Sequence, residues 1–348
     1  MGEKFFIIIF ICFLDFGNSS FYEGSFDENF AKTVSNFVAA AFIPPQTINS
    51  AELAQQCFEN GIPNVKWEKP VQYIRNSCAG YFNGECQLII TQSVISKMII
   101  IAFRGTIKKE QMNIEADKTI TTFIPWKYNK TFGNVNKYFF AAAENMWKHQ
   151  IESYLNNNKG YLIIFTGHSI GGAIASLSAL KANQLGLVDP GNIMLYTFGE
   201  PRTGDLDFSK NFHYLVPGSY RVVHNSDIVP HLPLCDGIFN DLCKNNASKA
   251  YHQPQEIWYN SPNLSMFDTE FKTCDENNGE DPNCSNSISA TEFLLNVDSD
   301  RGYSMHLNYF NHNLKEYGNK GCPLDILPTS TTPSTTPSNS ADSLMPFF

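Results

Sequence analysis

Residues 166–172 read TGHSIGG and follow the apolar run YLIIF, so a serine lies among glycines where one element ends. A serine hydroxyl is too weakly acidic to attack an ester unaided. It needs a histidine base, and that base needs an acid that fixes its tautomer and stabilises its charge. In the pattern G-x-S-x-G, Gly167 and Gly171 leave room for a sharp, strained turn, because side chains at both positions would collide. The pattern predicts that Ser169 is a nucleophile.

The order of the three groups along the chain guides the search for the partners of this serine. On a strand–turn–helix serine site, the acid follows the serine and the histidine comes last. The segment YRVVHNSDIVPHLP places Asp227 just after an expected strand, whereas Asp205 and Asp236 lack such a strand. Further on, GYSMHLNYF offers His306 as the base, with His312 as its nearest rival.

Other polar residues near these segments have structural interpretations. His224 and His231 flank the candidate acid too closely in sequence to face it across a site, which favours structural roles. Arg104 and Arg202 could clamp a phosphate or a carboxylate. The favoured interpretation is an internal ion pair or a hydrogen-bond anchor beside the site.

The candidate residues must be positioned by strands that alternate with helices. Apolar, β-branched runs predict strands at 97–103, 161–166, 193–199 and 220–223, and helix formers predict helices over 135–155 and 171–185. Such alternation predicts an α/β fold with a mostly parallel sheet and helices on both faces. A serine between a strand and a helix is typical of the nucleophile elbow of the α/β-hydrolase fold.

Six segments, in this order, resemble the class 3 lipases, the fungal triacylglycerol-lipase type of α/β-hydrolase. They are FRGT (103–106), TGHSIGG (166–172), TFGEPRTGD (197–205), YRVVHNSDIVPHLP (220–233), EIWY (256–259) and MHLNYF (305–310). The resemblance runs from about residue 34 to residue 322. It implies that Ser169 is the nucleophile, Asp227 the acid and His306 the base. It also implies an oxyanion hole formed by Thr106 and by the backbone N–H of Ile170.

The chain departs from the pattern of this family at three positions. Ile170 replaces the usual Leu, which is harmless because only its N–H is used. Glu200 stands where an uncharged Gln or Asn is common, and Met305 where Asp is frequent. We expect the last two changes to alter the neighbourhood of the base. In the family a histidine near His252 lines the pocket region, which makes His252 the second candidate base.

The cysteines predict a disulfide framework. Nine are present, and removal of a leader at 1–19 leaves eight, which allow 105 pairings. No CxxC pair or matching histidine spacing indicates a zinc site. The simplest arrangement has three disulfides that close local loops and one that joins the two ends of the domain, Cys57–Cys322. The class 3 lipases have counterparts of this long-range disulfide and of the 274–284 loop. The expected pairs are Cys78–Cys86, Cys235–Cys243, Cys274–Cys284 and Cys57–Cys322.

The ends of the chain predict secretion. Residues 1–19 carry one early lysine, about ten apolar residues and then small residues, as a signal peptide does, with a buried helix as the alternative. Residues 328–348 are rich in Pro, Ser and Thr, which predicts a disordered tail after one domain at 20–327. Four sequons, at Asn129, Asn246, Asn263 and Asn283, predict a secreted glycoprotein. No stretch after residue 19 approaches eighteen apolar residues, so we expect no transmembrane anchor.

These features together predict a secreted, monomeric serine ester hydrolase that cleaves acylglycerols through an acyl-serine intermediate, without a metal or cofactor. The net charge of −9 gives no support to nucleic-acid binding. Residues 107–120 are the candidate for a helical lid, which makes interfacial activation a hypothesis. The alternatives are an esterase for short-chain or feruloyl esters and a catalytically silent family member that binds lipids or glycans.

Overall fold

The computed structural model describes residues 25–69, 72–78, 84–106, 122–148, 151–235, 250–260, 266, 270–289, 291–292, 295–296 and 301–324. The predicted signal peptide (1–19), the lid candidate (107–120) and the predicted tail (328–348) lie outside these residues. So do the sequons at Asn246 and Asn263, and Cys243.

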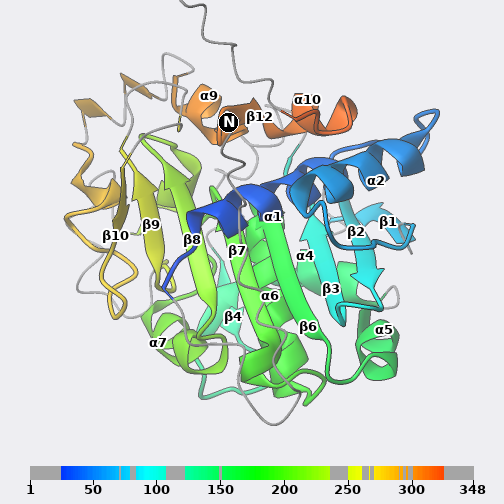
Figure 1. Cartoon of the computed structure of the whole chain (residues 1–348). Coiled ribbons are helices and arrows are strands. Elements are labelled where there is room, and N and C mark those ends of the chain that lie inside the picture. Colours follow the sequence, from blue (N-terminus) through cyan, green and yellow to red (C-terminus); the bar gives the residue numbers. More distant parts are fainter. Residues whose placement is uncertain are drawn as a thin grey trace, which may run out of the picture.

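An eight-stranded sheet forms the centre of the molecule, in the order β1-β2-β3-β6-β7-β8-β9-β10 (Figure 1). Strands β3, β6, β7, β8 and β9 pair in parallel, while β1, β2 and β3 pair antiparallel at one edge and β9 and β10 at the other. The predicted mostly parallel sheet is confirmed. The strands are β1 (Gln72–Ser77), β2 (Glu85–Ser93), β3 (Met98–Phe103), β6 (Leu162–His168), β7 (Ile193–Phe198), β8 (Ser219–His224), β9 (Glu256–Tyr259) and β10 (Phe271–Thr273).

Helices cover both faces of this sheet. In Figure 1, α1 and α2 lie in front of it, α4 and α6 lie behind, and α10 lies above its upper edge, next to α1. Strand β3 shows why both faces are covered: Ile99 and Ile101 belong to one buried cluster, and Ile100 and Ala102 to the other. The helices are α1 (Glu28–Ala41), α2 (Ser50–Gly61), α4 (Lys137–Trp147), α5 (Ile151–Asn157), α6 (Ile170–Gln184), α7 (Leu206–Leu215), α9 (Arg301–Leu307) and α10 (Leu314–Asn319).

The long helix predicted over 135–155 is wrong. Residues 134–136 form strand β5 (Asn134–Asn136), which pairs with β4 (Phe123–Pro125), and the helical residues belong to two separate helices, α4 and α5. The Asn136 side chain accepts hydrogen bonds from the backbone N–H groups of Tyr138 (2.9 Å) and Phe139 (3.2 Å). It therefore caps α4 and fixes its start after the strand.

Smaller elements complete the fold. A hairpin of β11 (Asn308–Tyr309) and β12 (His312–Asn313) follows α9. Single turns of 3₁₀ helix lie at η2 (Pro190–Asn192), η3 (Val229–His231) and η5 (Ser285–Ser287).

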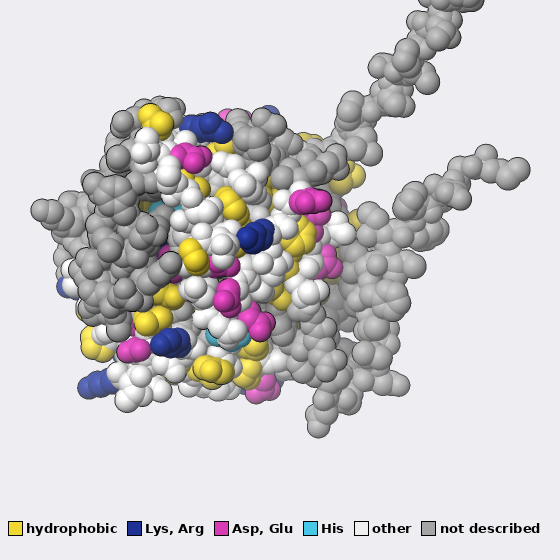
Figure 2. All heavy atoms as spheres, turned by 90° about the vertical axis from the view of Figure 1, so that its left-hand side faces the viewer, with side chains coloured by type: hydrophobic (Ala, Val, Ile, Leu, Met, Phe, Trp, Pro, Cys, Tyr) yellow, Lys and Arg dark blue, Asp and Glu magenta, His cyan; other side chains and the backbone are white. Residues whose placement is uncertain are grey.

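On the side of β10, acidic and basic side chains are interspersed with hydrophobic ones, so the described residues of this face form no basic patch (Figure 2). None of the described helices is both long and apolar enough to cross a membrane.

Three of the predicted disulfides are present among the described residues: Cys57–Cys322, Cys78–Cys86 and Cys274–Cys284. Cys235 is also disulfide-bonded. Because Cys243 lies outside the described residues, its pairing with Cys235 stays a prediction. The Cys57–Cys322 bridge joins residues 265 positions apart and so ties α2 to the segment after α10.

Candidate active site

The predicted nucleophile lies between β6 and α6. Ser169 has φ 58° and ψ −133°, a backbone conformation that a residue with a Cβ adopts only under strain. A Cβ built on Gly167 would lie 2.2 Å from Gly171 O, and one on Gly171 would lie 2.4 Å from Phe103 O. Both glycines are therefore required by the close approach of the backbone, as the pattern predicts.

The predicted acid and base contact each other. Asp227 lies in a turn after β8 in which its N–H donates to His224 O (2.9 Å), and His306 lies in α9. The His306 Nδ1 and Asp227 Oδ2 atoms are 2.9 Å apart, and both side chains are buried. The Tyr309 hydroxyl also donates to Oδ2 (2.7 Å), and the Val229 N–H donates to Oδ1 (2.9 Å).

These contacts keep the acid ionised. Burial alone would raise the pKa of Asp227, but attraction to His306 and hydrogen bonds from His306, Tyr309 and the Val229 N–H lower this pKa below its ordinary value. Burial and then the negative charge of Asp227 raise the pKa of Tyr309 well above its ordinary value, so the hydroxyl remains a donor. An ionised carboxylate only accepts, so His306 Nδ1 carries a proton and Nε2 is the basic nitrogen.

The two atoms between which the catalytic proton would pass are buried and lack hydrogen bonds. Neither Ser169 Oγ nor His306 Nε2 has a hydrogen-bond partner among the described residues, so these two atoms are not bonded to each other. Buried polar groups in this condition are rare and call for an explanation. In serine hydrolases the nucleophile–base contact is often loose without substrate and tightens in the complex.

His168 connects the elbow to the base. Its Nε2 donates to His306 O (2.6 Å), and the two imidazole rings lie 4.4 Å apart between centroids. Burial, and then the proximity of His306, lowers the pKa of His168 to about 3, so this ring is neutral. Sequence reasoning did not assign His168 a role, although its place inside the elbow heptapeptide was an available signal.

The predicted oxyanion loop packs directly on the elbow. A Cβ built on Gly105 would lie 2.5 Å from His168 Nδ1 and 3.2 Å from Ser169 Cβ. The next residue, Thr106, is buried. Ile170 is the first residue of α6, where backbone N–H groups have no acceptor within the helix. The loop that carries Thr106 and the N-terminus of α6 therefore lie against the same residue, Ser169.

The rival histidines lie elsewhere. His312 stacks on Tyr317, with ring centroids 3.7 Å apart, and His306 is the histidine that contacts the acid. His252 Nε2 donates to Pro230 O (2.6 Å), and burial lowers the pKa of His252 well below its ordinary value. His224 Nδ1 contacts Asn308 O at 2.7 Å. His252 and His224 therefore make structural contacts to backbone carbonyls.

Both arginines are anchored inside the protein. Arg202 is fully buried and forms a bidentate ion pair with Glu280, with distances of 2.8 Å and 2.9 Å. Arg104 donates to Gln87 Oε1 (3.2 Å) and to Glu85 O (2.5 Å). The interpretation as internal anchors is confirmed for both.

Glu200, one of the departures from the family pattern, is held by neutral donors. It is fully buried, and its carboxylate accepts four hydrogen bonds from uncharged side chains. Such donors satisfy a buried carboxylate without an ion pair. The donors are Ser176 Oγ (2.6 Å), Thr197 Oγ1 (2.7 Å), Thr203 Oγ1 (3.0 Å) and Gln253 Nε2 (2.7 Å).

A strained serine at a strand–helix junction and a buried Asp–His pair, on a mostly parallel sheet, are typical of serine hydrolases with the α/β-hydrolase fold. The family described as lipase (class 3) matches residues 100–237. A lipase of Caenorhabditis elegans is 33% identical over 263 residues, which cover 72% of this chain and 70% of the relative. The chain belongs to the class 3 lipase family and is a carboxylic ester hydrolase.

Fungal proteins provide further comparisons. The lipase of Rhizomucor miehei is 33% identical over 229 residues, which cover 62% of this chain and 53% of the relative. Among solved structures, the lipase of Rhizopus microsporus var. chinensis has a TM-score of 0.61 at 23% identity and covers 86% of this chain and 90% of its own. A Yarrowia lipolytica lipase has a TM-score of 0.63 at 18% identity, with coverages of 82% and 94%. These structures establish the shared fold.

Proposed function

We propose that this protein hydrolyses lipid esters, acylglycerols in particular, through an acyl-serine intermediate. The observation that carries the proposal is the buried contact between His306 Nδ1 and Asp227 Oδ2 (2.9 Å), linked through His168 to the strained Ser169. In this proposal Ser169 is the nucleophile, His306 the base and Asp227 the acid. No step of this chemistry requires a metal or a cofactor.

Acylation begins when Ser169 Oγ attacks the ester carbonyl carbon and its proton passes to His306 Nε2. Asp227 stabilises the imidazolium that forms. The C–O bond to the alcohol then breaks, and His306 gives its proton to the leaving alcohol. In the second half, water attacks the acyl-serine with the same base, and the acid and free Ser169 are released.

The negative charge that develops on the carbonyl oxygen needs donors that are already in place. The Ile170 N–H, at the N-terminus of α6, and the Thr106 N–H, on the loop that packs on the elbow, are the proposed donors. The helix N-terminus adds a partial positive charge at the same place. Loss of one such donor costs about 10²- to 10³-fold in turnover in serine hydrolases.

Relatives support lipid esters as the substrate class. The nematode and fungal relatives carry the name lipase. A triacylglycerol lipase whose catalytic centre is a serine protease triad shares the fold with a TM-score of 0.58. The chain spans about half the length of the fungal relatives it matches, so acylglycerol specificity is part of the proposal.

We also propose that the protein is secreted. The disulfides among the described residues favour an oxidising compartment. Asn129 and Asn283 are exposed, as acceptors for N-linked glycans must be. Mass spectrometry of the natural protein before and after removal of N-glycans tests this part: an unglycosylated protein with residues 1–19 retained contradicts it.

One set of assays tests the catalytic proposal. Hydrolysis of a short-chain ester, a long-chain triglyceride and a feruloyl ester is measured for the wild type and for Ser169→Ala. We expect activity on the triglyceride that the substitution abolishes. Activity that survives in Ser169→Ala contradicts the mechanism. Preference for the short-chain or feruloyl ester identifies an esterase, and an inactive, correctly oxidised wild type identifies a binding protein.

A further inference from the structure

The chain just after the candidate acid is held by an unusual set of hydrogen bonds. We call residues 227–233 the acid turn. Four consecutive carbonyls at its end, those of residues 230–233, each accept a hydrogen bond from one of two buried residues, Arg202 and His252. The contacts are His252 Nε2 to Pro230 O (2.6 Å), Arg202 Nη1 to His231 O (2.5 Å) and Pro233 O (3.1 Å), and the Arg202 N–H to Leu232 O (2.7 Å).

The acid turn also sets the position of the carboxylate. The Val229 N–H donates to Asp227 Oδ1 (2.9 Å), and Val229 begins η3, which contains Pro230 and His231. The carbonyls that Arg202 and His252 hold therefore belong to the same short turn as the N–H that orients the acid. A displacement of these carbonyls moves the donor to Asp227 as well.

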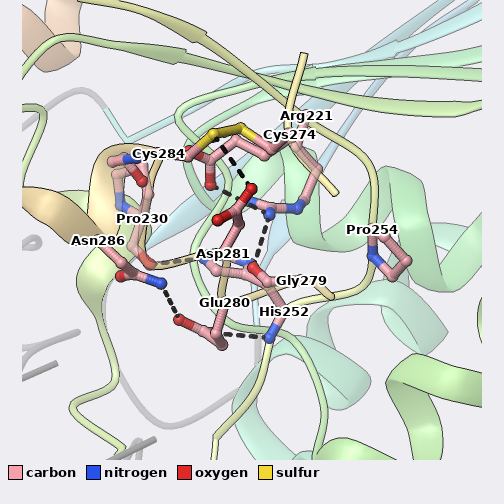
Figure 3. A network of polar contacts seen from close by, with 12 residues as sticks. Arg221, Pro230, His252, Pro254, Cys274, Gly279, Glu280, Asp281, Cys284 and Asn286 are labelled. Atoms are coloured by element: carbon pink, nitrogen blue, oxygen red, sulfur yellow. Dashed lines mark hydrogen bonds and ion pairs between the residues drawn. A yellow bond between two sulfur atoms is a disulfide. The ribbon is translucent and has the colours of Figure 1, made fainter. Parts of the chain in front are cut away.

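A single buried carboxylate holds both of these residues. Glu280 accepts two parallel hydrogen bonds from Arg202, Nε to Oε1 (2.8 Å) and Nη2 to Oε2 (2.9 Å). It also accepts the His252 N–H at Oε1 (3.0 Å) and Asn286 Nδ2 at Oε2 (2.7 Å). Figure 3 shows Glu280 between His252 and Asn286. A planar guanidinium bound in this two-point manner has a fixed orientation, so its remaining Nη1 points in one direction.

Glu280 belongs to a loop that a disulfide closes. The Cys274–Cys284 bridge joins the ends of this loop, and the loop packs tightly on the segment that contains His252 (Figure 3). A Cβ built on Gly279 would lie 1.8 Å from His252 O. Arg221 Nη2 donates to Gly279 O at 3.2 Å, which adds a second buried anchor. The position of the Glu280 carboxylate is therefore well determined.

We propose that Glu280 is a positioning residue for the acid: through Arg202 and His252 it holds the acid turn so that Asp227 faces His306. This inference rests on the proposed function, because it assigns Asp227 the role of the acid. Glu280 does not act on the substrate. Its effect on catalysis passes through the hydrogen bonds to residues 230–233, so its loss changes the reaction step more than substrate binding.

Glu280→Gln is the decisive substitution. It leaves Arg202 without a buried counter-charge and weakens the two-point contact that orients it. We expect kcat/KM on a soluble p-nitrophenyl ester to fall by roughly 10- to 100-fold, mostly through kcat, because a displacement of about 1 Å in a catalytic group has such an effect. We also expect the acid limb of the pH profile of kcat/KM to move to lower pH, because a less well placed Asp227 stabilises the protonated base less.

Glu276→Gln is the matched control. Glu276 lies in the same disulfide-closed loop, carries the same charge and is exposed. We expect this variant to keep the wild-type rate and pH profile. Rates are normalised to the folded fraction. This fraction is measured by titrating the active sites to completion with an organophosphonate. If Glu280→Gln does not fold, Arg202→Lys takes its place, because it keeps the ion pair but loses the fork that reaches the carbonyls.

The outcomes separate the two proposals. A normalised loss of kcat with a displaced acid limb, absent in Glu276→Gln, supports the positioning role. The positioning role is overturned if Glu280→Gln keeps the wild-type kcat and pH profile per folded molecule, even if its stability falls. The same holds for Arg202→Lys where that variant replaces Glu280→Gln. Activity that survives Ser169→Ala contradicts the proposed function, whereas an unchanged Glu280 variant of an enzyme that Ser169→Ala silences contradicts only the positioning role.

Discussion

Gly199 fits against His306 with no space for a side chain between them. A Cβ built on Gly199 would lie 2.8 Å from His306 Nδ1 and 2.7 Å from Asp227 Oδ2. Gly199 also has φ +60°, in the left-handed region that favours glycine. The end of β7 therefore forms one wall of the Asp–His pair, so the glycine in TFGEPRTGD has a steric reason at the site itself.

Substitution of this glycine should abolish activity. In Gly199→Ala the new methyl group must displace either the carboxylate or the imidazole, so we expect kcat to fall by about 100-fold or more. Gly186→Ala is the matched control, because Gly186 has φ +65° and no atom within 4 Å of a built Cβ. Gly186→Ala should lose about 1 kcal/mol of unfolding free energy in urea, because of its positive φ alone. Gly199→Ala should lose about 1–3 kcal/mol more, because its methyl group also overpacks the buried site. Equal activities of the two variants would contradict the steric argument.

The sequence predicts the residues that carry chemistry better than the contacts that position them. Ser169, Asp227 and His306 follow local patterns with a fixed order along the chain, and the parallel strands follow from apolar runs. The Arg202–Glu280 pair joins residues 78 positions apart, and no local pattern indicates such a pairing. The break at the start of the helix predicted over 135–155 depends on a single cap, Asn136, in a segment without glycine or proline.

Tyr309 illustrates the same limit. It follows the base by three residues, and the β11–β12 hairpin places its hydroxyl 2.7 Å from Asp227 Oδ2. Tyr309→Phe removes this donor but keeps the ring. We expect unfolding free energy at pH 7 to fall by about 1.5–3 kcal/mol, the usual contribution of a hydrogen bond to a charged group, and kcat/KM to fall roughly tenfold. Tyr214→Phe, at an exposed position on α7, should change neither quantity.

The disulfide that joins the two ends of the described domain should contribute more stability than a disulfide that closes a short local loop. The Cys57–Cys322 bridge spans 265 residues and the Cys78–Cys86 bridge spans 8. Loop closure in the unfolded chain predicts losses of about 5 kcal/mol for Cys57→Ala/Cys322→Ala and about 2–3 kcal/mol for Cys78→Ala/Cys86→Ala. Equilibrium unfolding in guanidinium chloride measures both. A larger loss for the short loop would show that native-state packing dominates over chain entropy.

Buried neutral histidines should make the protein sensitive to mild acid. Burial is the first cause that lowers the pKa of His168 to about 3, of His231 to about 4 and of His252 well below its ordinary value of 6.5. As the pH falls below about 6.5, the unfolded chain binds protons that the folded chain does not. The stabilisation is therefore complete above pH 6.5 and is lost progressively toward pH 4, at no more than about 1.4 kcal/mol per pH unit for each histidine. Urea unfolding at pH 7, 6, 5 and 4 measures this slope, and His231→Asn should reduce it by about a third. A free energy of unfolding that stays constant from pH 7 to pH 5 would contradict the neutral, buried state of these rings.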